Sequence, residues 1–124
     1  MKTKLFLFFI TTMFLFTKNI EAQMVLHYDT NNSAGTTITL PLGGTVIVSV
    51  DWGDGTPTEN FTTAGNQDHT YATAGDYTVS ITGSLTHFGS VNYANADKLT
   101  SVTNWDGLGI TSFQNAFQNA TNLT

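Results

Sequence analysis

Cysteine is absent from the 124-residue chain, and positive charge is scarce in it. Without cysteine no disulfide can stabilise the fold, so its stability must come from a packed core. Of the four Lys and Arg residues, only Lys98 lies beyond residue 22, a region that also holds eight acidic residues. The resulting formal charge of −7 over residues 23–124 argues against nucleic acid and anionic lipid surfaces as partners, because both are bound through Lys and Arg.

The first 22 residues have the pattern of a secretory signal peptide. Lys2 and Lys4 precede an apolar run over residues 5–16, and Ile20-Glu21-Ala22 offers a small residue at a cleavage site before Gln23. The run of about 12 residues is too short to span a bilayer, which takes about 20. No cysteine follows it, which disfavours a lipid anchor. We therefore predict a secreted or cell-surface protein with no stable membrane span after cleavage; a retained N-terminal anchor is the alternative.

Short stretches of alternating apolar and polar residues predict an all-β fold. The clearest runs over residues 45–52, where the valines at alternate positions share one face with Trp52, which places Trp52 in the core. Further strands are predicted over residues 25–28, 36–42, 77–82 and 85–93, and the strand over 77–82 is predicted to pair with residues 46–52. Turns are predicted at Gly43-Gly44, Asp54-Gly55 and Gly75-Asp76, and a strand end at Gly83. Residues 57–68 are predicted to be a loop or a weak edge strand.

Two segments in the middle of the chain carry a recognisable pattern. Val50-Asp51-Trp52-Gly53-Asp54-Gly55-Thr56 is followed by a segment from His69 to Thr82 that begins His-Thr-Tyr and contains Gly-Asp-Tyr-Thr-Val. Together they resemble the PKD domain, an immunoglobulin-like β-sandwich module of surface and secreted proteins. The resemblance implies such a sandwich over residues 23–95, with Trp52 where the family usually has Phe. It also implies that the hydroxyl of Tyr71 bonds to the backbone, as in a tyrosine corner, and that His69 is a packing or hydrogen-bonding residue.

Beyond residue 95 the sequence echoes itself. Leu99-Thr100-Ser101-Val102 resembles Ile110-Thr111-Ser112-Phe113, and Leu123-Thr124 begins a third echo. Apolar residues spaced i, i+3, i+4 and i+7 predict a helical face of about two turns. These residues are Phe113, Ala116, Phe117 and Ala120.

This stretch resembles the leucine-rich-repeat surface proteins of the BspA type. The resemblance implies an incomplete leucine-rich-repeat segment over residues 96–124, made of a short strand and a short helix. Because one repeat is not stable alone, we expect the sequence to be part of a longer protein. The alternative is that this segment caps the sandwich as a small accessory element.

Four aspartates near the two motif segments are candidates for a calcium site. They are Asp51, Asp54, Asp68 and Asp76. Calcium takes about six to eight oxygen ligands, which clustered carboxylates and backbone carbonyls can supply. Turn chemistry is the competing explanation and the stronger one, since an aspartate beside a glycine accepts backbone N–H bonds in a tight turn. No metal site and no cofactor is therefore predicted.

Catalytic motifs are missing from the sequence. It has no cysteine nucleophile, no H-E-x-x-H zinc motif and no phosphate-binding Gly-rich loop before a helix. We predict a non-enzymatic protein that mediates interaction or adhesion, with the sandwich as a spacer that supports the repeat. An extracellular protein or a carbohydrate is the expected partner. The alternative is an accessory binding or spacer module of an exported hydrolase, such as a protease or a polysaccharide-degrading enzyme.

Overall fold

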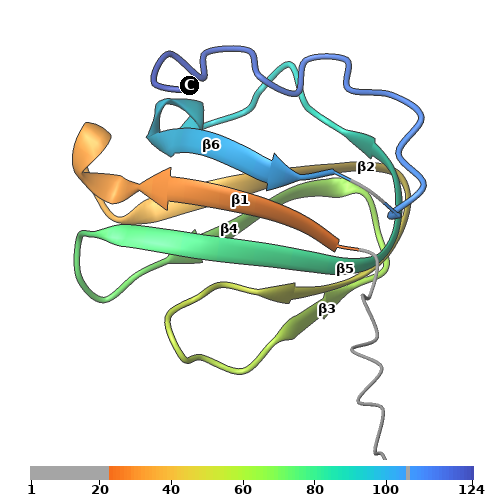
Figure 1. The fold of residues 1–124 in the computed structure, drawn as a ribbon, viewed down its shortest axis with the longest axis horizontal. Coiled ribbons are helices and arrows are strands. Elements are labelled where there is room, and N and C mark those ends of the chain that lie inside the picture. The colour runs from red at the N-terminus through yellow and green to blue at the C-terminus, as the bar shows by residue number, and fades with distance from the viewer. Residues whose placement is uncertain (1–22, 106) are drawn as a thin grey trace, which may run out of the picture.

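The computed structural model describes residues 23–105 and 107–124 (Figure 1). The signal peptide predicted over residues 1–22 lies outside them. The described residues form strands and two short 3₁₀ helices. These elements are β1 (Gln23–Asp29), η1 (Thr30–Asn32), β2 (Thr37–Asp51), β3 (Glu59–Phe61), β4 (Gly65–Thr70), β5 (Asp76–Phe88), η2 (Ala96–Lys98) and β6 (Leu99–Asn104). The prediction of an all-β fold is confirmed.

The strands form one antiparallel sheet in the order β3-β2-β5-β1-β6, and β4 pairs with the first part of β2. Residues 37–42 of β2 pair with β4, whereas residues 42–51 pair with β5. Because β2 pairs with β4 along its first part and with β5 along its second part, the sheet curls. In Figure 1, β4 and the first part of β2 lie behind β1 and β5. Val50 pairs with Ile81, which confirms the predicted partnership of the two alternating strands.

Two glycine positions bend the long strands β2 and β5 without ending them. Gly43-Gly44 lies inside β2, at a shift in its register with β5. Gly83 lies inside β5 with φ +109°, and a Cβ there would be 2.3 Å from the carbonyl oxygen of Ile47. The predicted turn at 43–44 and strand end at Gly83 are therefore wrong, because glycine also permits two backbones to approach closely inside a sheet. The strand predicted over 85–93 is not a separate strand, since residues 85–88 continue β5, which ends at Phe88.

The alternation of residues 45–52 is confirmed by burial. Val46, Val48, Val50 and Trp52 are buried in the core. Ile47, between two of the valines, is 62% exposed. A strand with one apolar face is what a sheet with one buried side requires, and each large buried side chain contributes about 1.5–3 kcal/mol.

The polar stretch 57–68, predicted to be a loop or an edge strand, contains β3 and most of β4. Both pair with one edge of β2. Phe61 is the apolar contact of this stretch, since its ring meets the ring of Trp52 edge-on at a centroid distance of 6.4 Å. The edge-strand alternative is thus the one observed.

The helix predicted over residues 113–120 is wrong; the chain there forms successive turns. The N–H of Ala116 bonds to the carbonyl of Phe113 at 3.0 Å, and the N–H of Ala120 bonds to that of Phe117 at 3.1 Å. Asn115 and Asn119 have φ of 60° and 65°, in the left-handed region that a right-handed helix excludes. Turns of four residues repeat apolar positions at i and i+4, as a helix does, so the apolar spacing alone does not separate the two structures. The strand predicted at residues 99–102 is confirmed as part of β6.

Lys98 is completely buried where η2 meets the start of β2. Its Nζ donates to the carbonyl oxygens of Ala34 and Thr37 at 3.0 and 3.1 Å and to Oδ1 of Asn95 at 3.4 Å. These acceptors compensate for the water that burial removes from the ammonium group. Because residues 23–124 hold no other Lys or Arg, their surface carries carboxylates without lysine or arginine.

Candidate functional site

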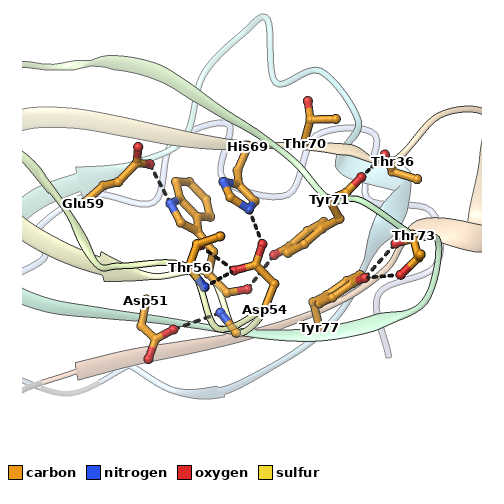
Figure 2. A network of polar contacts seen from close by, with 12 residues as sticks. Thr36, Asp51, Asp54, Thr56, Glu59, His69, Thr70, Tyr71, Thr73 and Tyr77 are labelled. Atoms are coloured by element: carbon orange, nitrogen blue, oxygen red, sulfur yellow. Dashed lines mark hydrogen bonds and ion pairs between the residues drawn. The ribbon is translucent and has the colours of Figure 1, made fainter.

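The turn that follows β2 is organised by two aspartates (Figure 2). Asp51 accepts a hydrogen bond from the backbone N–H of Gly53 at 2.9 Å. Asp54 accepts bonds from both the backbone N–H and the hydroxyl of Thr56. Gly53 has φ +78°, and a Cβ there would lie 2.2 Å from the carbonyl oxygen of Thr78. Turn chemistry therefore accounts for both carboxylates, and glycine is required by the close passage of β5.

Four aromatic rings contact one another in a row beside this turn. The ring of His69 lies parallel to that of Trp52, with centroids 4.5 Å apart, and meets Tyr71 edge-on at 4.7 Å. Tyr71 in turn stacks on Tyr77 at 3.5 Å. Such contacts add about 0.5–1.5 kcal/mol each to the burial of the rings. Since the rings cover one another and Trp52 and Tyr71 are buried, their faces serve packing.

The polar atoms of these rings are also paired within the fold. The hydroxyl of Tyr71 donates to the backbone carbonyl of Trp52 at 2.7 Å, which confirms the expected hydroxyl-to-backbone bond. The indole N–H of Trp52 donates to a carboxylate oxygen of Glu59 at 2.6 Å. His69 shares a hydrogen bond of 2.8 Å with Asp54, so its predicted packing and hydrogen-bonding role is confirmed. The motif is thus a connected scaffold that ties the turn to β4 and β5.

Among the acidic residues of this scaffold, Asp54 has a clearly shifted pKa. Desolvation raises the pKa of its carboxyl group, but hydrogen bonds from Thr56 and His69 outweigh desolvation and lower the pKa to about 2. Burial, together with the charge of Asp54, raises the pKa of the Tyr71 phenol well above its ordinary value. The carboxylate and the neutral phenol are therefore the stable forms at neutral pH.

The other two calcium candidates lie apart from the turn. Asp68 is in β4, where it accepts a hydrogen bond from the hydroxyl of Thr39 at 2.6 Å. Asp76 begins β5, in register with Asp29. Among residues 23–105 and 107–124 no three His, Cys, Asp or Glu side chains are grouped so that they can hold a metal ion. Asp51, Asp54, Asp68 and Asp76 therefore do not form a common coordination shell in this structure.

A cluster of exposed aromatic rings lies elsewhere, in the C-terminal segment. We call Trp105, Phe113 and Phe117 the aromatic trio. Trp105 meets Phe113 and Phe117 edge-on at 5.3 and 5.5 Å, and Trp105 and Phe113 are 41% and 40% exposed. The sequence did not predict this cluster, because the spacing of the two phenylalanines was interpreted as the apolar face of a helix. The sequence does contain one indication of the cluster, since three aromatic residues fall within 13 positions of a segment with little charge.

A shallow apolar recess of about 390 Å³ lies on the other side of the fold, beside β3. It is lined by Ile47, Val48, Ser49, Asn60, Phe61, Thr62, Thr82 and Gly83. It contains no charged side chain.

The chain matches no family model, no curated protein and no solved structure among those compared. None of the described helices has the length and apolarity that crossing a membrane demands. The function must therefore be inferred from the residues themselves.

Proposed function

We propose that the protein is a non-enzymatic secreted or cell-surface module that mediates interaction with an extracellular protein or a carbohydrate. In this proposal residues 23–95 are an immunoglobulin-like sandwich of the PKD type that acts as a rigid spacer. Residues 96–124 are a repeat-like segment that presents the interaction surface. The observation that carries the proposal is the aromatic trio, in which Trp105 and Phe113 are exposed, whereas Trp52 and Tyr71 of the motif are buried.

The sandwich part of the proposal is supported by three features of the fold. The sheet curls around one core, its two central alternating strands pair as expected, and Tyr71 ties β4's end to the turn after β2. In immunoglobulin-like domains a tyrosine at a corner between strands also donates its hydroxyl to the backbone. A scaffold held this way suits a spacer, because its polar groups are satisfied within the fold.

The chemistry of the aromatic trio suits an interaction surface. Exposed aromatic side chains offer large contact area at low entropic cost, and Trp is enriched among residues that dominate binding energy. The trio lies on a surface that carries carboxylates but no lysine or arginine, since Lys98 is buried. A neutral sugar or a protein surface with basic residues therefore fits it better than an acidic partner.

A binding assay with a matched control tests this function. The full chain is applied to immobilised neutral and N-acetylated oligosaccharides and to extracellular-matrix proteins, beside the double variant Trp105→Ser/Phe113→Ser. We expect the double variant to lose tenfold or more in affinity for whichever surface the wild type binds, because truncating central aromatic residues costs about 2 kcal/mol or more.

The control is Ile47→Ser, which removes an exposed apolar side chain far from the trio in sequence. It should bind as the wild type does. Equal binding by the double variant and the wild type would contradict the assignment of the surface. A wild type that binds none of the probes, or that hydrolyses one, would contradict the proposed function itself.

A further inference from the structure

A glycosylation sequon lies beside the shallow apolar recess. Asn60-Phe61-Thr62 has the Asn-x-Ser/Thr pattern that accepts an N-linked sugar in exported proteins. The same three residues line the recess, together with others that include Ile47 of β2 and Gly83 of β5. An attachment point for a sugar and a patch of apolar surface therefore occur at one place in the fold.

The acceptor groups of this sequon are accessible. Asn60 and Thr62 are exposed, and β3, which holds Asn60, lies at the edge of the sheet beside β2 (Figure 1). In the part of the chain that the structure describes, the Asn60 amide and the Thr62 hydroxyl have no hydrogen-bond partner. A glycan can therefore be attached at Asn60 without breaking a contact of the fold.

The other three sequons of residues 23–124 begin at Asn31, Asn119 and Asn122. The amide nitrogens of Asn31 and Asn122 already face the protein, donating to Oδ1 of Asp29 at 2.9 Å and to the carbonyl of Asp97 at 2.7 Å. Asn119 is exposed, but it does not line the recess. The sequon in β3 is thus the one that combines a free amide with an adjoining apolar surface.

We propose that Asn60 is an N-glycosylation site and that its first sugar, an N-acetylated hexosamine, covers the recess. In the transfer, Nδ2 of Asn60 forms a bond to C1 of the sugar of a polyprenyl-pyrophosphate-linked oligosaccharide. The C1–O bond to the pyrophosphate breaks, the pyrophosphate leaves with the electron pair, and the amide nitrogen gives one proton to a base of the transferase. The inference rests on the export of the protein, which is part of the proposed function, and not on the binding role of the aromatic trio.

Such a sugar matches the recess in chemistry. Its acetyl methyl and its C–H groups are apolar, and Ile47 in the wall of the recess is 62% exposed. Contact between them removes apolar surface of both from water, while the hydroxyls of the sugar stay hydrated. A glycan on β3 also blocks the edge of the sheet, where an exposed strand otherwise invites pairing with another chain.

The test uses the full chain secreted by cultured human cells that are held at the high-mannose stage, followed by an endoglycosidase that leaves one sugar on each site. A triple variant, Ser33→Ala/Thr121→Ala/Thr124→Ala, removes the other three sequons and keeps their asparagines in place. We expect its intact mass to show one sugar, which is lost when Thr62→Ala is added and kept when Thr62→Ser is added instead.

Two further readouts test the covering of the recess. We expect nuclear Overhauser effects between the acetyl methyl of the sugar and the side chains of Ile47 and Phe61. We also expect the glycosylated triple variant to melt on the order of 4 °C above the matched chain with Thr62→Ala.

Three results would overturn the proposal at different steps. A triple variant that is secreted without a sugar removes Asn60 as a site. A sugar that shows no Overhauser effect to Ile47 and leaves the melting temperature unchanged removes the covering of the recess. Retention of the chain inside the cells contradicts export, on which the proposed function also depends. None of these readouts involves a ligand of the aromatic trio, so the binding role is judged by its own assay.

Discussion

The aromatic residues of the motif and those of the C-terminal segment have opposite situations in the same molecule. Trp52 and Tyr71 are buried, stacked and hydrogen-bonded through their polar atoms. Trp105 and Phe113 contact each other but remain about two-fifths exposed. The contrast teaches that the most recognisable part of the sequence builds the packed scaffold, while the exposed aromatic surface lies in the less recognisable part.

The difference has a physical origin in backbone pairing. The motif lies at the end of β2 and along β4 and β5, so its side chains are enclosed by strands on several sides. The C-terminal turns bond to β5 at a few separate points, such as the N–H of Thr111 to the carbonyl of Thr86 at 2.9 Å and the parallel bridge between His87 and Ser112.

The largest expected effect compares the two tryptophans. Trp52→Ala should reduce the free energy of unfolding by about 3–5 kcal/mol, because it leaves a cavity at a fully buried position. Trp105→Ala should reduce it by about 1 kcal/mol or less, as a substitution of an exposed residue. Urea unfolding followed by circular dichroism measures both. Equal losses would remove the contrast between scaffold and surface.

A smaller effect is expected within the motif itself. Tyr71→Phe should cost about 1–2 kcal/mol, since it leaves the buried carbonyl of Trp52 without its hydroxyl donor. Tyr77→Phe removes a comparable bond of 2.6 Å to the carbonyl of Thr73, but at an exposed position where water replaces it. Its cost should be about 0.5 kcal/mol or less. Urea unfolding of both variants shows whether the hydrogen bond of Tyr71 contributes more to the free energy of unfolding than that of Tyr77.

The smallest expected effect is a pH dependence centred on Asp54. Its pKa is lowered from 3.8 to about 2 in the fold, so its stabilising contribution is fully present above pH 4 and is lost as the pH falls through 2. Asp54→Asn should therefore be less stable than the wild type at pH 6, with a difference that disappears near pH 2.

A second variant isolates the cause of this pH dependence. Thr56→Val removes the hydroxyl that donates to Asp54, so it should raise the pKa of the carboxyl group in an NMR titration. An unchanged pKa would assign the shift to His69 and to the backbone N–H of Thr56, which the substitution leaves in place.

Much of the fold can be predicted from the sequence, because alternation reports directly on which face of a strand is buried. It correctly placed the core side chains of residues 45–52 and the pairing of that strand with residues 77–82. The predictions at Gly43-Gly44 and Gly83 were wrong, because the sequence alone does not distinguish a glycine that ends a strand from one that bends it. The prediction at residues 113–120 was wrong as well, because turns and helices share a four-residue spacing.

The candidate site was less predictable. The residues of the motif were identified, and the bond of Tyr71 to the backbone was expected. The aromatic trio was not, because exposure depends on which turn covers which ring, and that is set by contacts far apart in the sequence. The aspartates show the same limit, since proximity along the chain did not bring Asp68 and Asp76 to the turn.

The burial of Lys98 has a practical consequence for proteolysis. Trypsin cleaves after lysine and arginine, so residues 23–124 offer it one cleavage site, the bond between Lys98 and Leu99, and both of these residues are fully buried. Cutting there requires the contact between η2 and the start of β2 to open. The rate of tryptic cleavage therefore reports the opening of the fold at a single bond, with no label added.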